Sequence, residues 1–263
     1  MGWKQIRELY KNGNEIAAHG YYHIKYGKYL PVEKLRAQMT QIKELIENEL
    51  KTTVYTIHYP YSFTSDSIVS AAKKTGFLFG RTADMNFNNA NDNNLYLIKS
   101  QPIINNNNPS TKTFVSWLQQ AKGKWLVLMY HHLFPEKSKE MNILRYHKVK
   151  NTYSLLPDTF NKQIEILSKT DYWKAPIYQI GMYIYERKNT TIKSHRICKT
   201  FKIKTKTVAD TTKYTQALTM QVRLPWQKVL VKRSLKDGIY KVKDNLLLID
   251  FKPGKTIIIK KIK

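Results

Sequence analysis

An alternation of short apolar segments with amphipathic helical segments fills the first 187 residues and constrains the fold more than any other feature. Apolar residues at helical spacing predict helices, and Pro31 and Gly76 stand where one helix should start and another should stop. The apolar run at 125–130 suits a fully buried parallel strand. Strand–helix repeats of this kind indicate a parallel α/β sheet or barrel. The expected helices are 3–11, 31–50, 66–74, 111–121, 158–167 and 177–186, and the expected strands are 54–59, 77–81, 125–130 and 173–176.

The character of the chain changes after Arg187, where short β-rich segments follow one another between turn residues. This pattern predicts a small all-β domain over residues 190–263, folding separately from an α/β domain over residues 1–187. From Lys188 onward, 20 Lys and Arg stand against four Asp and no Glu, so most of the excess positive charge lies in this tail. The expected tail strands are 201–205, 218–224, 229–232, 245–250 and 256–259.

The net charge of the whole chain is +26, from 45 Lys and Arg against 19 Asp and Glu. Such an excess suggests a polyanionic partner, whereas a Lys- and Asn-rich composition with scattered lysines has the same net charge and no partner. The one cysteine, Cys198, excludes an internal disulfide and is expected to be a small core residue. The sequence contains no apolar run long enough for a transmembrane helix.

Two histidines, His19 and His23, follow a short apolar segment, 15–18, that can form a buried strand. Histidines four residues apart lie on one face of a helical turn, where both imidazoles can reach one metal ion. The end of a parallel strand is also where ligands bind in α/β folds. The alternative is a pair of surface or hydrogen-bonded histidines.

Three short motifs occur in order: His-Gly-Tyr-Tyr-His at 19–23, Tyr-Pro-Tyr-Ser at 59–62 and Leu-Met-Tyr-His-His at 128–132. Together they resemble the polysaccharide deacetylases of the NodB-homology type, carbohydrate esterase family 4, over residues 1 to about 187. The resemblance implies a distorted (β/α) barrel and a divalent metal, usually zinc. It also implies a hydrolase that removes acetyl groups from N-acetylated polysaccharide. The tail resembles a small β-sandwich found in some bacterial members.

The resemblance assigns roles to individual residues of this chain. His19 and His23 match the two metal-binding histidines, and His131 matches the general acid that protonates the leaving amine. Tyr61 matches the residue whose backbone N–H stabilises the oxyanion. Met129, Tyr59 and Pro60 match substrate-binding positions, with Met129 beside the acetyl methyl group. His132 is a second candidate for the acid, and His147 and His195 are interpreted as loop histidines.

The sequence departs from the family at two places. His58 stands where many members have an arginine, and Asp84 could be the acid that normally pairs with that arginine. The Asp-Asp motif expected ahead of the histidines, which supplies a metal ligand and the catalytic base, is absent, as are the first barrel strands. The chain is therefore interpreted either as an N-terminally truncated deacetylase or as an impaired, non-catalytic relative.

Two further expectations concern partners and location. The alternative function is a non-catalytic binding protein for acidic or N-acetylated glycans, with the basic tail holding an anionic cell-surface polymer. Nucleic acid ranks last, because it is supported by net charge alone. The family resemblance implies export or a place in the cell envelope, while the chain as written, without a signal region, would be cytoplasmic.

Overall fold

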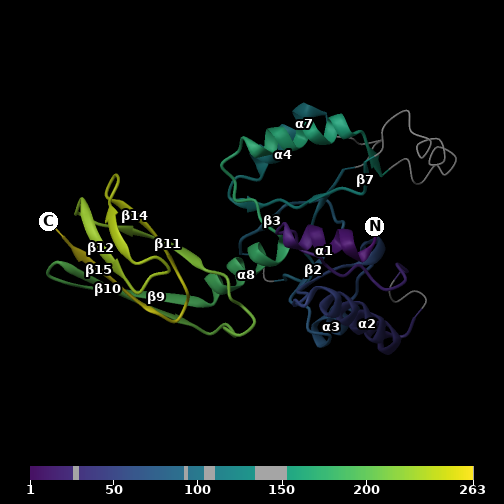
Figure 1. Cartoon of the computed structure of the whole chain (residues 1–263), viewed down its shortest axis with the longest axis horizontal. Helices are drawn as coiled ribbons and strands as arrows, with labels where there is room; N and C mark the ends of the chain where they lie inside the picture. The colour runs from purple at the N-terminus through teal and green to yellow at the C-terminus, as the bar shows by residue number, and fades with distance from the viewer. Residues whose placement is uncertain (26–29, 92–93, 104–109, 134–152, 263) are drawn as a thin grey trace. The chain divides into compact units, whose positions relative to one another are not determined.

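The computed structural model describes residues 1–25, 30–91, 94–103, 110–133 and 153–262. The chain divides into two compact units, residues 1–178 and 179–263 (Figure 1). The first unit is mixed α/β. The division falls within α8 (Ile177–Lys188), earlier than the boundary expected at 187–190. Whether the two parts fold separately stays a prediction.

The helices of the first unit begin and end at residues that satisfy their free backbone groups. Ser65 caps its helix by accepting a hydrogen bond from the Ile68 N–H, and Ser110 does the same for the Thr113 N–H. Gly13 and Gly76, with φ of 86° and 90°, follow two helix ends in the left-handed conformation. Most of the expected helices are therefore found within a residue or two of their predicted bounds. They are α1 (Trp3–Lys11), α2 (Val32–Leu50), α3 (Asp66–Lys74), α4 (Thr111–Gln120), α7 (Pro157–Ser168) and α8, with a 3₁₀ turn η1 (Pro60–Ser62).

Short parallel pairings connect successive strands of the first unit. Ala18 bridges to Ile57 of β1, β1 pairs with β2, and Arg81 of β2 bridges to Ile98. Two further pairs, β4 with β6 and β7 with β8, are also parallel, whereas β3 and β5 are antiparallel. Because parallel strands have their carboxyl ends at the same edge, the residues that follow 18, 58 and 81 come together there. The strands are β1 (Thr56–His58), β2 (Phe79–Arg81), β3 (Asn88–Asn89), β4 (Gln101–Pro102), β5 (Lys124–Trp125), β6 (Leu128–Met129), β7 (His132–Leu133) and β8 (Ser154–Leu155).

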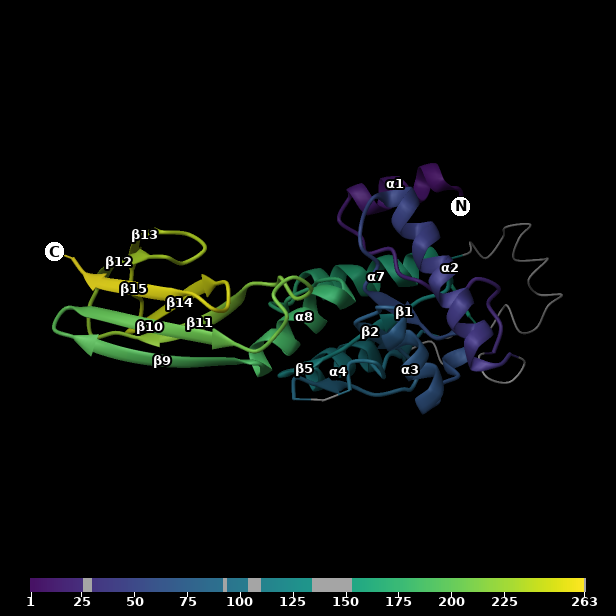
Figure 2. The ribbon, with the colours of Figure 1, turned by 90° about the horizontal axis from the view of Figure 1, so that it is seen from below.

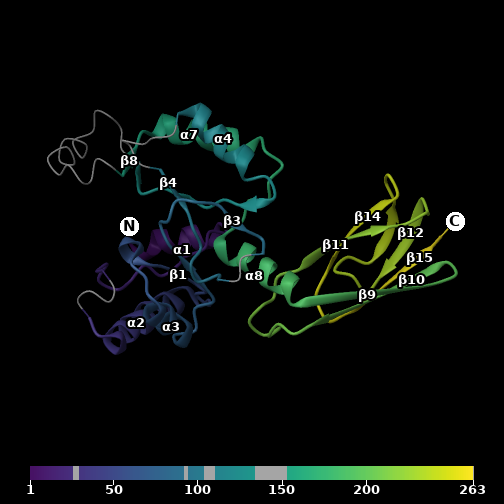
Figure 3. The ribbon, with the colours of Figure 1, turned by 180° about the vertical axis from the view of Figure 1, so that it is seen from behind.

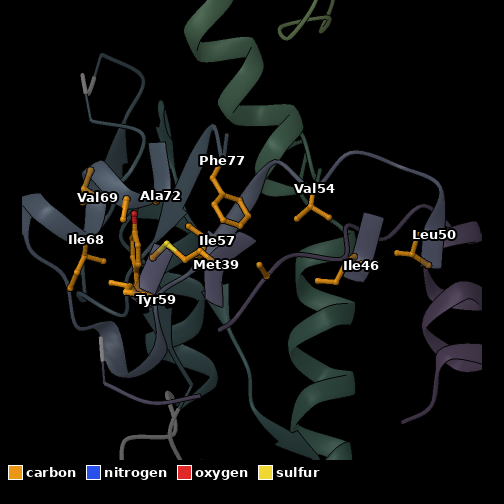
Figure 4. Packing of buried hydrophobic residues seen from close by; sticks show 13 residues of the cluster. Met39, Ile46, Leu50, Val54, Ile57, Tyr59, Ile68, Val69, Ala72 and Phe77 are labelled. Carbon is orange, nitrogen blue, oxygen red and sulfur yellow. The ribbon is translucent and has the colours of Figure 1, made fainter. Parts of the chain in front are cut away.

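A hydrophobic cluster joins α2 and α3 to β1 (Figure 4). The apolar stripe of α2 contributes Leu35, Met39 and Ile46, and Ile57 comes from β1. Phe77, fully buried, precedes β2. Figure 3 shows α2 and α3 side by side, and α4 beside α7. This packing holds the first strands, and so the segments that follow them, in place.

The second unit has two antiparallel sheets that share one hydrophobic cluster. Five strands lie in the order β13–β12–β15–β10–β9, and β11 pairs with β14. Figure 2 shows β9, β10 and β15 side by side. Alternate residues of both sheets point into the cluster, among them Ile203, Val231 and Ile249. The strands are β9 (Thr190–Ile197), β10 (Thr200–Thr207), β11 (Leu218–Arg223), β12 (Lys228–Lys232), β13 (Gly238–Lys241), β14 (Leu246–Phe251) and β15 (Thr256–Lys261).

Four expectations were wrong or incomplete. Residues 125–130 do not form one buried strand, because β5 pairs antiparallel with β3 while β6 pairs parallel with β4, and residues 126–130 are half-buried. Residues 173–176 form no strand. Cys198 is exposed, with φ of 49°, because it lies in the tight turn between β9 and β10 rather than in the core. Strands β9 and β13 of the second unit were not predicted, and neither were the two-residue strands β3, β4, β7 and β8 of the first.

Candidate functional site

The two histidines of the first motif face each other. The Nε2 atoms of His19 and His23 are 3.2 Å apart, and the two rings meet edge to face. Two ligands of one tetrahedral zinc ion, each about 2.0–2.1 Å from it, have their nitrogens about 3.3 Å apart. The pair therefore has the spacing that two ligands of such an ion need.

The orientation of the His19 ring is set by the backbone of β1. Its Nδ1 lies 2.8 Å from the carbonyl oxygen of His58. A carbonyl can only accept, so Nδ1 carries the proton and Nε2 keeps its lone pair. A backbone carbonyl behind a histidine is a common support for a metal ligand. Burial lowers the pKa of His19, and its neutral form is the one that binds metal.

No third candidate ligand joins the histidine pair among the described residues. Among them, no group of three or more His, Cys, Asp or Glu side chains has the arrangement to hold an ion. Glu15, four residues before His19, is engaged elsewhere. Its carboxylate accepts hydrogen bonds from Thr56 Oγ1 at 2.5 Å and from the Tyr178 N–H at 3.2 Å.

A strained turn follows β1 beside the histidine pair. Tyr61 and Ser62 have φ of 55° and 58°, in the left-handed region that non-glycine residues avoid. The Tyr61 ring is 60% exposed, and its centre lies 4.8 Å from that of His23. Pro60 is buried, and Tyr59 is only 2% exposed. The Tyr59 side chain is therefore not accessible to a substrate, and only its backbone could contact one.

Arg81, at the end of β2, is the residue of this site that sequence reasoning missed. Its side chain is buried, and its guanidinium donates to the Met129 sulfur at 2.5 Å and weakly to the Thr82 carbonyl at 3.4 Å. Burial lowers the pKa of Arg81 to about 10, and no described carboxylate forms a salt bridge with it. The sequence did contain a sign of this residue, because Arg81 ends the apolar run at 77–81 and a charged side chain is rarely buried without a partner or a function.

His131 lies close enough to Arg81, His19 and His23 for their charges to affect its pKa. Desolvation lowers its pKa most, followed by the positive charges of His132 and Arg81 and then by those of His19 and His23. The His131 ring is exposed and packs against Tyr153, with 4.6 Å between ring centres. His132 is also exposed, in β7, and His195 is exposed in β9. His147 lies outside the described residues.

His58 and Asp84 do not pair. Asp84 instead accepts hydrogen bonds from Thr82 Oγ1 at 2.9 Å and from Ser62 Oγ at 3.5 Å. The buried His58 Nε2 has no partner among the described residues. Burial and then the charge of Arg81 hold the pKa of His58 well below its usual value, so the ring is neutral. His58 also lines a pocket of about 400 Å³, together with Gly13, Asn14, Glu15, Ala17, Ala175, Pro176 and Ile177.

Residues 1–80 match the family model for polysaccharide deacetylase. A comparison with curated protein sequences gives no match. The deacetylase PplD of Streptococcus pyogenes, solved in complex with acetate, is similar with 18% identity over 44% of this chain and 50% of its own, at a TM-score of 0.38. The BpsB deacetylase domain of Bordetella bronchiseptica has 21% identity, over 38% of this chain and 47% of its own, at a TM-score of 0.34.

A de-N-acetylase from Aggregatibacter actinomycetemcomitans has 18% identity, over 38% of this chain and 47% of its own, at a TM-score of 0.32. The chain thus spans about half the length of these three structures. Likenesses this distant support no inference about function. No helix in the described part of the chain is both long and apolar enough to cross a bilayer.

Proposed function

We propose that the first unit, whose residues 1–80 match the polysaccharide deacetylase family model, is a deacetylase-type hydrolase unit for N-acetylated polysaccharide, working with a divalent metal. In this proposal its short parallel strands form the wall of a distorted (β/α) barrel. The observation that carries the proposal is the 3.2 Å separation of the His19 and His23 Nε2 atoms, with His19 held by the His58 carbonyl.

His19 and His23 would hold the metal, with zinc the best fit to two imidazoles. When bound, such an ion supplies a Lewis acid that polarises the acyl carbonyl. The Tyr61 N–H would donate to the oxyanion that develops on that carbonyl, from a turn already fixed in the left-handed region. That oxyanion would form as water adds to the acyl carbon and loses a proton. The carbonyl would then re-form as the carbon–nitrogen bond breaks, and His131 would give its proton to the leaving amine, so that acetate and the free amine are released. Met129 would line the place of the acetyl methyl group, while Tyr59 and Pro60 shape the turn.

The proposed activity is low, because the described residues place no free carboxylate beside the histidine pair. Hydrolysis needs an acceptor for the proton of the attacking water. Glu15 is bonded to Thr56 and Tyr178, and Asp84 to Thr82 and Ser62. A positioned base typically contributes about 10²–10⁴-fold to the rate, so its absence costs that much.

The same observation favours a second candidate function, a non-catalytic binding protein for acidic or N-acetylated glycans. A unit that keeps the histidine pair but has no base would bind without turnover. The two candidates differ in one measurable quantity, the release of acetate.

Zinc titration by calorimetry tests the metal site. We expect one ion per chain and a loss of affinity of at least about tenfold in His19→Ala, since even supporting residues of metal sites contribute about 10–100-fold. His195→Ala, which removes an exposed histidine of β9, is the control and should bind as the parent does. Zinc binding that is unchanged in His19→Ala would overturn the assignment.

Acetate release from N-acetylated chito-oligosaccharides with added zinc decides between the candidates. Slow release that His19→Ala abolishes supports an impaired enzyme. No release, with zinc binding intact, supports the binding protein. Rapid release would refute the impaired activity and require a carboxylate that now appears engaged in other bonds.

A further inference from the structure

The outward face of the five-stranded sheet in the second unit carries a dense field of positive charge. In β10, Ile203 and Thr205 are buried, so the residues between them point outward. Residues paired across neighbouring strands share a face, and the register extends this outward set over all five strands. Its basic members, all exposed, are Lys193, His195, Lys202, Lys204, Lys206, Lys228, Lys232, Lys241 and Lys260.

The rest of the outward set is neutral. It consists of Thr191, Ile197, Thr200, Leu230, Ile239, Thr256 and Ile258, so no acidic residue interrupts the lysines. None of the eight lysines forms a salt bridge with a described residue. Lys232 lowers the pKa of Asp237, but it does so less than the Arg233 and Ser234 backbone N–H groups do.

The other sheet of this unit does not share the charge. Its outward residues are Thr219, Gln221 and Arg223 in β11, and Leu246, Leu248 and Asp250 in β14. One Arg and one Asp balance, and no Lys is present. A lysine-rich composition alone would place lysines on both outward faces. The segregation of eight lysines to one face therefore calls for a partner of opposite charge.

The geometry of the face suits a long polymer. Lys202, Lys204 and Lys206 recur at about 6.7 Å along β10, and neighbouring strands are about 4.8 Å apart. Exposed cations this close repel one another, and a polyanion laid across them relieves the repulsion while releasing its own counterions. We propose that this lysine face binds an acidic polysaccharide, whose ring carboxylates meet the lysines as point charges.

Two features favour a polysaccharide over nucleic acid. The face has no Arg, whose planar guanidinium is the side chain of choice for phosphate and nucleic-acid recognition. It also has no Phe, Tyr or Trp on which bases could stack. The choice of polysaccharide rests on the function proposed above for the first unit, because a polymer held by the second unit would be the one that the first unit processes.

Binding of the full chain to sodium polygalacturonate, followed by fluorescence anisotropy of labelled polymer over 25–300 mM salt, tests the face. We expect Lys202→Gln/Lys204→Gln/Lys206→Gln to weaken binding at low salt by at least about tenfold and to reduce the salt slope by about three. The matched control is Lys236→Gln/Lys243→Gln/Lys255→Gln, which removes the same charge from three exposed positions between strands. It should change the affinity less than about twofold. Fully methyl-esterified polygalacturonate, which has no charge, should not bind.

Each outcome decides the proposal. Equal weakening by both triple variants would show diffuse attraction by net charge, and no weakening by either would show that the face is not used. Tighter binding to duplex DNA than to polygalacturonate, at equal concentration of charge, would assign the face to nucleic acid. None of these readouts involves deacetylation, so the lysine face and the catalytic proposal can fail separately.

Discussion

The Nδ1 atom of His19 lies 2.8 Å from the backbone carbonyl oxygen of His58, and this contact fixes which nitrogen of His19 carries a proton. The bare Nε2 then faces the Nε2 of His23, which must donate in the absence of a metal. The pairing of Ala18 with Ile57 of β1 holds the contact in place. The backbone of β1 thus sets the ring orientation of His19.

We expect this tautomer to be visible in solution. In metal-free protein at pH 8, long-range ¹H–¹⁵N spectra should show His19 protonated at Nδ1 and bare at Nε2, because the carbonyl accepts only from Nδ1–H. His195, exposed in β9, is the internal comparison. A His19 ring protonated at Nε2 would contradict the arrangement.

Removing the charge of Arg81 should raise the pKa of His131. Desolvation and His132 lower that pKa most, and Arg81 is the next cause, so Arg81→Met removes a repulsion that disfavours the imidazolium. The pH titration of the His131 Hε1 signal measures the shift. Arg36→Met, which changes an exposed arginine of α2, should leave the titration unchanged. An equal shift in both variants would mean that only net charge acts.

Gly80→Ala should destabilise the first unit. An added Cβ would lie 2.5 Å from the Tyr59 hydroxyl and 2.6 Å from the Tyr96 backbone oxygen, and the backbone atom cannot move away cheaply. Overpacking of this kind typically costs about 1–3 kcal/mol, which urea unfolding resolves. Gly2→Ala, where an added Cβ meets nothing within 4 Å, should cost less than about 1 kcal/mol. Equal stability of the two variants would contradict the close approach of Gly80 in β2 to Tyr59 and Tyr96.

Glu186 should make the stability of the second unit fall as pH rises. Its side chain is buried, and desolvation raises its pKa from 4.5 to about 7, against smaller opposing effects of Gln216 and Lys252. The folded state therefore binds more protons than the unfolded state, and stability is lost as pH rises from about 4.5 through about 7.

Glu186→Gln mimics the protonated form and should be more stable than the parent at pH 8 and about equal to it at pH 4. Thermal unfolding at the two pH values measures this difference. Asp244→Asn, a change at an exposed acid of the same unit, is the control and should keep the parent's pH dependence. A Glu186→Gln variant that loses stability equally at both pH values would show that the carboxylate is needed ionised.

A fragment of residues 177–263 should fold alone. Its two sheets share a hydrophobic cluster, against which Tyr183 of α8 packs, and Tyr185 stacks on Tyr214 at 4.0 Å. Dispersed amide signals and a cooperative melt would support separate folding of this part of the chain. An unfolded fragment would instead mean that the α/β part is required.

The sequence predicted the helices well because local signals define them. Gly76 marks the end of α3 as expected, and the apolar stripe of α2 is the buried one. His19 and His23 face each other, but the helical turn expected to bring them together is absent, because residues 19–23 form a bend with Gly20 and His23 at φ of 78° and 50°.

Other features depended on tertiary context that no local pattern reports. Strand β9 was missed because residues 191–197 are exposed on both faces, so no apolar alternation marks it. The prediction of one buried strand over residues 125–130 was wrong because β5 pairs antiparallel with β3, whereas β6 pairs parallel with β4. Arg81 was missed because its burial against Met129 joins residues 48 positions apart.

Strand β9 lies at the edge of its sheet, hydrogen-bonded to β10 and to no other described strand. An unpaired strand edge is a template for joining a second copy of the same chain, and charged side chains are a common means of preventing this. Lys193, His195 and Arg196 therefore protect this edge against self-association. A polyanion that neutralised them would remove that protection, so we expect the protein to gather into β-paired clusters along a bound polymer and to disperse again as salt is added.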